Sequence, residues 1–473
     1  GHGKPHLRGW APWQSELEKI SNTCELEIPM LEQGYLDYKR AIDKLIFDDP
    51  TVLDYVHPLH IDANLAGVDG VNVINAIDRS TSMGWPHNTP KKHFIIPKEE
   101  EVEGITCPMT MVPELEYEVN TARKILASGH RVNFIGRASL KDEPTKLTKT
   151  KVRVFVASPC ALIILMREYF LTICKFIQEH PDVFECAVGT NAYGKDWTNI
   201  AKRITRFGLE RCLAGDFEAF DSKMAAQLVL LAFKIMIAIA ELAGYNEEQI
   251  IIMHGIATEI AHYFVEFNGE FYRAIGSNPS GHSLTVIVND LVNSIYMRYV
   301  YYAVFNGVPP GDFNEHVALV TYGDDNVMSV SEDVADKFNH STIAKTLGEC
   351  GINYTMADKK SESVPFIPFS SCTFLKRAFT WSEKYQQWLG PIEEASIFKS
   401  LHAVVKSKVL TPEQQSDEVV HNACREYFYH GEEKYNMRRE QLQHVVDDSG
   451  FSHVFRDLPS FQELEDEYIE KYC

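Results

Sequence analysis

Apolar and polar residues alternate on both sides of a short turn in the segment 318–330, ALVTYGDDNVMSV. Val320 and Tyr322 alternate with polar neighbours before the turn, and Val327 continues the apolar pattern after it. The Gly-Asp-Asp-Asn sequence between them has the residue types of a tight turn. The pattern therefore predicts a β-hairpin with two adjacent aspartates at its tip.

Longer segments have the patterns of helices. The segment 228–240, LVLLAFKIMIAIA, is almost wholly apolar and too short to span a bilayer, which predicts a buried helix. Further helices are predicted over 247–263 and 284–301, with an Asn-Gly hairpin between them over 265–272. The C-terminal part beyond about residue 383 is mainly helical and charged, whereas the N-terminal part gives no clear periodic pattern.

Composition indicates a folded protein with an acidic balance. The chain has 473 residues, 45% hydrophobic and 24% charged, which is enough for several domains or one multi-lobed domain. Its 10 cysteines include no Cys-x-x-Cys pair, so neither a zinc site nor a disulfide framework is indicated, and a reducing compartment is expected. The net charge of −20 opposes nucleic-acid binding unless positive charge is concentrated locally, in which case affinity should fall steeply with salt.

Positive charge is concentrated in the segment 140–155, LKDEPTKLTKTKVRVF. The alternating apolar residues at its end predict a strand on which Lys151 and Arg153 point to the same face. Such a pair can hold a triphosphate, because Arg is a bidentate donor and Lys a point charge. The alternative is a basic hairpin on the surface.

Two aspartates precede the predicted apolar helix. Asp216 is expected at the end of a short strand, and Asp221 at or just before the start of the helix. A carboxylate at that place is favoured as a helix cap and by the helix dipole. The alternative is that Asp221 contacts a ligand.

Two loops of small residues permit a close approach of the backbone to a ligand. The loop 276–283, GSNPSGHS, opens a helix on which Thr285 and Asn289 share a face, and it suits a phosphate or a sugar. The loop 80–86, STSMGWP, is suited to contact a nucleic-acid backbone and to stack on a base. For both loops the alternative is an ordinary turn.

Taken in order, these motifs resemble the RNA-dependent RNA polymerases of picornavirus-like positive-strand RNA viruses, from about residue 80 to 400. The details are more similar to picorna-like viruses of marine protists or invertebrates, such as marnaviruses or dicistroviruses, than to mammalian enteroviruses. The matching elements are Thr81 to Pro86, Lys141-Asp142-Glu143 with Lys151-Val152-Arg153, Asp216 with Asp221, Ser280-Gly281 with Thr285 and Asn289, Tyr322 to Asp325, Asp358-Lys359, and Phe374 to Arg377.

The resemblance implies an α+β fold shaped as a closed right hand, with fingers, palm and thumb. The palm would be an antiparallel sheet and the thumb helical. The implied domains are fingers at 1–175 with N-terminal fingertips, palm at 176–244 and 279–382, a fingers insertion at 245–278, and thumb at 383–473.

The resemblance also implies template-directed RNA synthesis by two-metal transfer of nucleotides from ribonucleoside triphosphates (rNTPs) to an RNA 3′-hydroxyl. Asp216, Asp324 and Asp325 would hold two Mg²⁺ ions, with Mn²⁺ as a substitute. Lys359 matches the general acid that protonates the leaving pyrophosphate, and the alternative for it is a solvated lysine in a turn.

The other matched residues have binding roles in that family. Asp221 and Asn289 would read the ribose 2′-hydroxyl, which both donates and accepts, and this favours RNA over DNA synthesis. The implied nucleotide-binding set is Lys141, Lys151, Arg153, Asp221, Ser280, Gly281, Thr285 and Asn289. The implied RNA-binding set is Thr81, Ser82, Gly84, Phe374, Leu375, Lys376 and Arg377.

The partners implied by the resemblance are an RNA template and primer, rNTPs, a small viral protein primer and other viral replication proteins. These would meet in replication complexes in the host cell cytoplasm, with membrane association only through partners because no transmembrane segment is expected. Three alternatives stay open: a reverse transcriptase, a catalytically silent RNA-binding scaffold with the same fold, and an unrelated Mg²⁺-dependent phosphotransfer enzyme.

Overall fold

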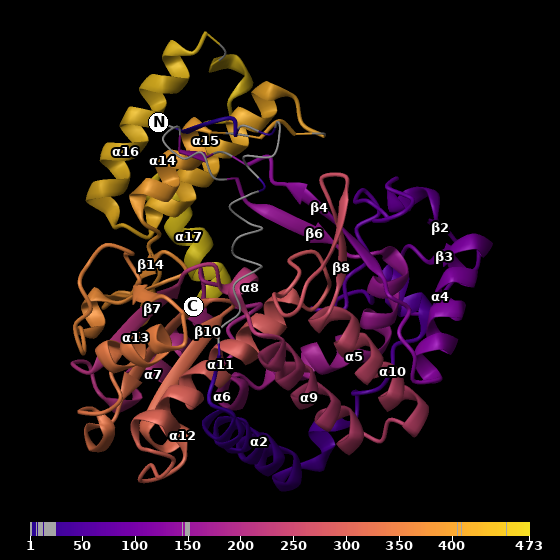
Figure 1. The fold of residues 1–473 in the computed structure, drawn as a ribbon. Helices are drawn as coiled ribbons and strands as arrows, with labels where there is room; N and C mark the ends of the chain where they lie inside the picture. Colours follow the sequence, from indigo (N-terminus) through magenta and orange to yellow (C-terminus); the bar gives the residue numbers. More distant parts are fainter. Residues whose placement is uncertain are drawn as a thin grey trace.

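A four-stranded antiparallel sheet lies at the centre of the computed structural model (Figure 1). The strand order is β10-β11-β7-β12, formed by Val317–Tyr322, Asp325–Val330, Cys212–Phe217 and Tyr354–Met356. The predicted hairpin is confirmed, because β10 and β11 pair from Val317↔Val330 to Tyr322↔Asp325. Residues 2–5, 7, 13, 25–143, 145–146, 152–403, 405–407, 409–450 and 452–473 are described.

Burial explains why this sheet forms. All six residues of β7 are buried, so the strand is covered on both faces. Helix α11 (Thr285–Val304) packs against β10, and α13 (His340–Glu349) packs against β12 and α11. Nearly every residue of α11 is buried, which confirms the helix predicted there and makes it the central support of the sheet.

A helical layer lies beside the sheet (Figure 1). The apolar segment forms α9 (Ala226–Leu242), which packs on α10 (Glu247–Ala261), so the predicted buried helix is confirmed. Helices α4 (Pro113–Ala127) and α5 (Cys160–Glu179) complete this layer.

The Asn-Gly hairpin is also present, and it belongs to a second four-stranded sheet. Its strands are β8 (Phe264–Phe267) and β9 (Glu270–Arg273), as predicted. The sheet order is β6-β4-β8-β9, with β4 at Ile135–Leu140 and β6 at Val154–Ala157.

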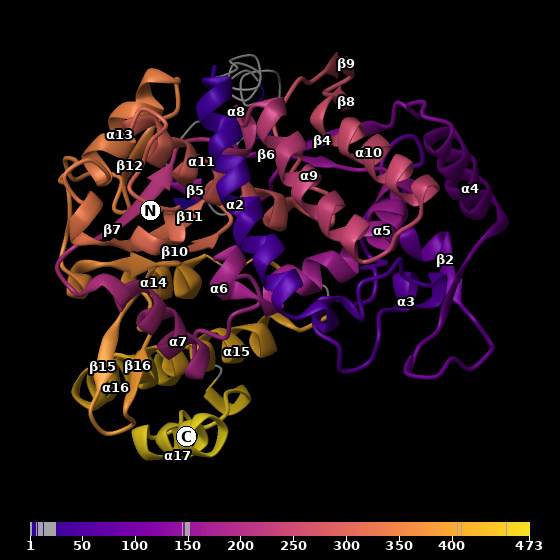
Figure 2. The same cartoon turned by 90° about the horizontal axis from the view of Figure 1, so that it is seen from below.

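One long helix in the N-terminal part was not predicted. Helix α2 (Ile28–Asp48) crosses the underside of the molecule and packs along α11 (Figure 2). Its buried residues Leu31, Tyr35, Tyr38, Ile42 and Ile46 recur at helical spacing, so the signal was present among polar residues.

The C-terminal part has a core of its own. Helices α14 (Glu394–His402), α15 (Pro412–Phe428), α16 (Glu432–Asp448) and α17 (Phe461–Tyr472) enclose one hydrophobic cluster. The expected thumb boundary at residue 383 falls in the hairpin between β15 (Thr380–Ser382) and β16 (Gln387–Leu389), and it stays a prediction.

The remaining elements are short, and no helix in the described residues has the length and apolarity to cross a membrane. The short strands are β1 (His2–Gly3), β2 (Ile95–Pro97), β3 (Met109–Met111), β5 (Thr145–Lys146), β13 (Thr373–Phe374) and β14 (Arg377–Ala378). The other helices are α3 (Ile61–Ala66), α6 (Pro181–Phe184), α7 (Lys195–Ile204), α8 (Phe220–Lys223) and α12 (Phe313–His316). The 3₁₀ turns are η1 (Pro50–Leu53), η2 (Lys91–His93), η3 (Thr205–Phe207), η4 (Glu332–Val334), η5 (Phe369–Ser371) and η6 (Ser452–Val454).

Candidate active site

One cavity of about 1210 Å³ opens over the end of the central sheet where β7 ends and the β10–β11 hairpin turns. It brings together most of the residues singled out from the sequence, although they come from six separate segments. The predicted residues that line it are Lys141, Arg153, Asp216, Asp221, Ser280, Asp324, Asp325, Lys359, Phe374, Leu375 and Lys376.

Asp216 lies on β7 and faces a lysine across the cavity. Its Oδ2 is 2.9 Å from Nζ of Lys359, whose side chain is 67% exposed. Lys359 follows β12 with a left-handed backbone (φ 59°), in a turn that Asp358 holds by accepting from the backbone N–H groups of Lys360 and Ser361. The exposed ammonium group of Lys359 is thus held at the carboxylate of Asp216.

Asp324 and Asp325 lie at the hairpin tip, where three carboxylates crowd together. Burial raises the pKa of Asp325 to about 6, and the charges of Asp324 and Asp216 add to that shift. The pKa of Asp324 is also raised, by its enclosure in the cavity and then by the charge of Asp216, even though part of its side chain reaches solvent. The site therefore concentrates negative charge that a cation would stabilise.

Asp290 and Asn293 of α11, which the sequence analysis did not single out, form hydrogen bonds with the backbone of this hairpin tip. The backbone N–H of Gly323 donates to Oδ1 of Asp290 at 3.0 Å. The side-chain amide of Asn293 donates to the carbonyls of Gly323 at 3.0 Å and Asp325 at 3.3 Å. Asp290 and Asn293 are three apart and follow the predicted Asn289, so their helical spacing was a usable signal.

Asp221 is paired with Asn289, as the resemblance implied. The amide Nδ2 of Asn289 donates to Oδ1 of Asp221 at 2.6 Å, and burial raises the pKa of Asp221 to about 6. The expectation that Asp221 caps the long apolar helix is wrong. Asp221 lies inside the short helix α8, whereas α9 begins at Ala226.

Of the loop that precedes α11, only Ser280 reaches the cavity among the predicted residues. Gly281 packs on β6, where an added Cβ atom would lie 2.1 Å from the carbonyl oxygen of Val156. The hydroxyl of Thr285 donates to the carbonyls of Pro279 and His282, at 2.9 and 3.0 Å. Gly281 and Thr285 thus shape the loop and do not face the cavity.

The basic segment is only partly described. Lys141 and Arg153 line the cavity, and the backbone N–H of Lys141 donates to the carbonyl of Arg153 at 2.8 Å. The side chain of Arg153 is 70% exposed, with Glu143 at 3.7 Å. Lys151 lies outside the described residues, so its predicted position on the same face as Arg153 stays a prediction.

The predicted RNA-contacting hairpin divides between two roles. Phe374, Leu375 and Lys376 line the cavity, but Arg377 does not. The guanidinium of Arg377 donates to both carboxylate oxygens of Glu426 on α15, at 2.8 and 2.9 Å, and to the carbonyl of Gly390. The buried side chain of Arg377 thus ties β14 to the C-terminal helices, and its predicted contact with RNA stays a prediction.

The loop with Thr81, Ser82 and Gly84 lines or borders a different cavity. Thr81 and Ser82 line a space of about 300 Å³ together with Gly281 and His282. Lys91, which sequence reasoning did not single out, is buried there and donates from Nζ to the Thr81 hydroxyl at 2.6 Å.

Gly84 has a different task in the same loop. It has φ 79° and packs against the carbonyl of Ser158, where an added Cβ atom would lie at 2.9 Å. Its freedom from a side chain serves the packing of the loop, and it does not line either cavity.

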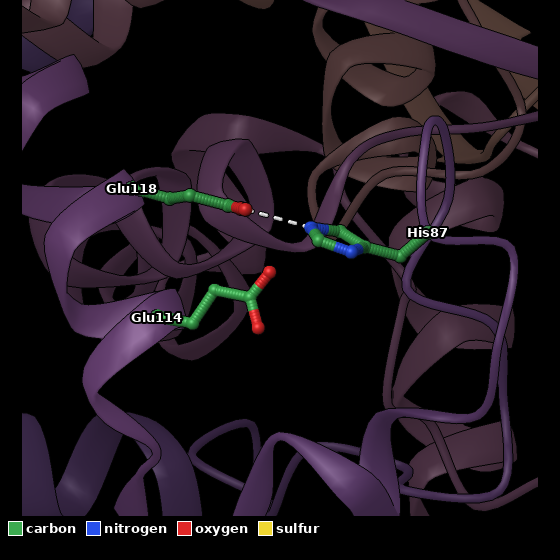
Figure 3. A group of neighbouring side chains, drawn as sticks. All are labelled: His87, Glu114 and Glu118. Atoms are coloured by element: carbon green, nitrogen blue, oxygen red, sulfur yellow. Dashed lines mark hydrogen bonds and ion pairs between the residues drawn. The ribbon is translucent and has the colours of Figure 1, made fainter.

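A separate group of potential metal ligands lies on α4 and on the loop that precedes η2. Figure 3 shows His87, Glu114 and Glu118, and within the part of the chain that the structure describes they alone place three such ligands within 4.8 Å. The aspartates of the central sheet are thus spaced more widely. Nε2 of His87 already lies 2.6 Å from Oε1 of Glu118, and Glu114 is stabilised in the first turn of α4. These contacts account for the group without a ligand.

Comparison with known proteins adds the decisive observation. A family model described as "Viral RNA-dependent RNA polymerase" matches residues 18–446. The chain belongs to this family. The chain is 32% identical over 407 residues to a replicase polyprotein of Drosophila C virus, covering 82% of the chain and 23% of that relative. It is 28% identical over 474 residues to the RNA1 polyprotein of Cowpea mosaic virus, covering 97% of the chain and 24% of that relative.

A solved structure shows the fold of the polymerase independently. A sicinivirus 3Dpol RNA-dependent RNA polymerase superposes with a TM-score of 0.74 at 19% identity, covering 95% of this chain and 87% of the other. The expected α+β right-hand fold and the picornavirus-like family are confirmed. The chain spans about a quarter of the length of these curated relatives. Membership of the family implies dependence on divalent metal ions in general.

Proposed function

We propose that the polymerase synthesises RNA on an RNA template, by transfer of nucleotides from rNTPs to an RNA 3′-hydroxyl. The observation that carries this proposal is the convergence of Asp216, Asp324, Asp325 and Asp221 in one cavity, with Asn289 hydrogen-bonded to Asp221. The first three supply charge for phosphoryl chemistry, and the Asp221–Asn289 pair supplies groups for a ribose. An unrelated phosphotransfer enzyme is excluded by the family.

The donor set fits two divalent ions. Asp216, Asp324 and Asp325 offer carboxylate oxygens, which Mg²⁺ prefers, and Mn²⁺ accepts the same ligands. The raised pKa values of Asp324 and Asp325, caused by burial and by mutual repulsion, support a place for cations. When bound there, the ions would lower the pKa of the 3′-hydroxyl and stabilise charge on the triphosphate.

The side chains around these aspartates then have separate tasks. Lys141 and Arg153, at the cavity wall, would hold the triphosphate, with Lys151 as a third candidate. Ser280 would contact the incoming nucleotide, and Phe374 to Lys376 would steady the primer strand. Lys359 would donate a proton to the leaving pyrophosphate from its position beside Asp216.

The Asp221–Asn289 pair favours RNA over DNA synthesis. A carboxylate accepts from the ribose 2′-hydroxyl and an amide donates to it, so both groups lose a partner when the sugar is deoxyribose. This argues against a reverse transcriptase. The convergence of four aspartates in one cavity argues against a silent scaffold, since the repulsion among them serves no structural purpose.

The partners follow from the same proposal. Template and primer RNA, rNTPs, a small viral protein primer and other viral replication proteins would meet the polymerase in cytoplasmic replication complexes of the host cell. Its relatives are parts of polyproteins, which supports neighbours from the same virus. We retain fingers at 1–175 and 245–278, palm at 176–244 and 279–382, and thumb at 383–473 as proposed domains.

Template direction is the property to test first for this function. Four RNA hairpins that differ only in the first unpaired template base are each offered the four rNTPs singly, with Mg²⁺. We expect the complementary rNTP to be added fastest on every hairpin, because the cavity aligns a paired nucleotide with the 3′-hydroxyl. Addition that ignores the template base would contradict the proposal and would indicate a terminal transferase.

Lys359 is expected to act on the chemical step. Lys359→Leu should lower kcat about a hundredfold with little change in the KM for rNTPs, since general-acid catalysis typically contributes that much. Single-turnover rates at saturating rNTP measure this loss in the chemical step.

Lys359→Arg is the matched control for charge. It keeps a cation beside Asp216 but cannot release a proton, so its rate should stay low. A fully active Lys359→Arg variant would mean that Lys359 serves only as a positive charge.

A further inference from the structure

We propose that His282 and Asn278 are positioning residues that set the direction of the Asn289 amide and, through it, the selection of ribose over deoxyribose. The inference rests on the proposed function and deepens it. A hydrogen-bonded series runs from His282 through Asn278 and Asn289 to Asp221. All four residues belong to the part of the chain that the structure describes. His282, Asn278 and Asn289 are 8%, 2% and 7% exposed, so water cannot easily replace their partners.

The series begins at a ring whose tautomer is fixed by the backbone. Nδ1 of His282 lies 3.1 Å from the backbone nitrogen of Leu284, which can only donate, so Nδ1 must accept. Nε2 therefore carries the hydrogen and donates it to Oδ1 of Asn278 at 2.8 Å. Burial lowers the pKa of His282 to about 3, which keeps the ring neutral and this tautomer in place.

The hydrogen-bond partners of Asn278 permit only one orientation of its side-chain amide. Its Nδ2 lies 3.1 Å from the carbonyl oxygen of Thr285, which can only accept. The amide oxygen of Asn278 therefore faces His282, and its Nδ2 also donates to Oδ1 of Asn289 at 2.8 Å. The backbone N–H of Leu284 can only donate, and the carbonyl of Thr285 can only accept. Together they determine which way the oxygen and the nitrogen of the Asn278 amide point.

As a result, Asn289 turns its NH₂ group toward Asp221, which lines the cavity. Nδ2 of Asn289 donates one hydrogen to Asp221 at 2.6 Å and keeps a second hydrogen. A 2′-hydroxyl placed there donates to the Asp221 carboxylate and accepts from Asn289. With the amide reversed, the Asn289 oxygen would oppose the Asp221 carboxylate, and the 2′-hydroxyl would find two acceptors and no donor.

Both positioning residues belong to the loop that precedes α11. Asn278 and His282 flank Ser280. Asn278 borders the cavity together with Ser280 but is only 2% exposed, whereas His282 does not line the cavity. The polar atoms of Asn278 are bonded to His282, Thr285 and Asn289, so both residues act through Asn289. Their effect should be on discrimination between sugars and not on the transfer of phosphate.

Asn278→Asp tests the direction of the series with almost no change in shape. The introduced carboxylate only accepts, so Asn289 must turn its NH₂ toward it and its oxygen toward Asp221. The ratio of kcat/KM for GTP to that for dGTP, measured for one addition on an RNA hairpin, is expected to fall about tenfold, the effect of one lost hydrogen bond. The fall should come from GTP, with dGTP almost unchanged.

A pair of variants tests His282. The pair also keeps the inference testable if the Asn278→Asp protein does not fold. His282→Leu removes the donor to Asn278 and should lower the GTP/dGTP ratio by a similar factor. His282→Gln keeps an amide donor and should restore most of the wild-type ratio. His421→Leu is the matched control, since His421 is a buried histidine on α15 that contacts backbone carbonyls, and its loss should leave the ratio unchanged.

The outcomes separate this inference from the function on which it rests. A wild-type ratio in a folded His282→Leu or Asn278→Asp protein would overturn the positioning role, as would equal losses in His282→Leu and His282→Gln. Wild-type protein that adds no nucleotide to any RNA hairpin would instead overturn the proposed function. Thermal unfolding of each variant shows whether it is folded.

Discussion

Replacing Asp216 with asparagine is expected to reduce RNA-templated extension on the order of a thousandfold. Asp216 lies on β7, an inner strand of the central sheet whose six residues are all buried. The amide keeps the shape of the side chain but removes the negative charge that would hold a divalent ion and that attracts Lys359 at 2.9 Å. Transfer of a phosphoryl group depends on such charge more than on covalent chemistry.

The substitution should slow the chemical step without weakening the binding of RNA. Asp216→Asn protein should bind a primer-template RNA at least as tightly as the wild type in a gel-shift titration, because the substitution removes a carboxylate that repels phosphates. Asp43→Asn serves as the control, since Asp43 pairs with Lys39 on α2 and does not line the cavity. An Asp216→Asn variant with more than a tenth of the wild-type rate would show that the ions are held elsewhere.

Arg298→Ala is expected to destabilise the polymerase by about 3–5 kcal/mol, which is the usual effect of leaving buried charges without their partner. Arg298 lies on α11 and is fully buried. Its Nε donates to Asp37 on α2 at 3.0 Å, and its two terminal nitrogens donate to Glu185 at 2.8 and 2.9 Å. Truncation leaves both carboxylates in the core, between α2 and the helix that supports the hairpin tip.

The change in stability is measured as a shift of the urea unfolding midpoint. Arg137→Ala is the matched control, because Arg137 pairs with Glu266 at 3.6 Å with 44% of its side chain exposed and has no contact with Asp37 or Glu185. Exposed pairs contribute little, so the control should lose less than about 1 kcal/mol. Equal losses in the two variants would contradict the importance of the buried network.

The sequence predicted those parts of the site whose residues are close in the chain. The Gly323–Asp324 turn is short enough for residue types alone to indicate a hairpin, and its strands are confirmed. The pairing of Asp221 with Asn289 joins distant segments, and only the resemblance to a family placed them together.

Other features depend on tertiary contacts that no local pattern contains. Helix α2 escaped prediction because its apolar stripe is interrupted by polar residues and finds its partner only on α11. Arg377 has the sequence context of an RNA contact, but its partner Glu426 lies 49 residues further along the chain. Asn278 and His282 resemble ordinary loop residues until the buried series that joins them to Asp221 is seen.

The central claim, that this cavity synthesises RNA, is tested most directly by extension of a labelled RNA hairpin with Mg²⁺. Wild-type and Asp324→Asn proteins are each supplied with rNTPs or with deoxyribonucleotides. We expect extension by the wild type with rNTPs, far less with deoxyribonucleotides, and none by the variant. Equal extension by the Asp324→Asn protein, or a preference for deoxyribonucleotides, would contradict the account.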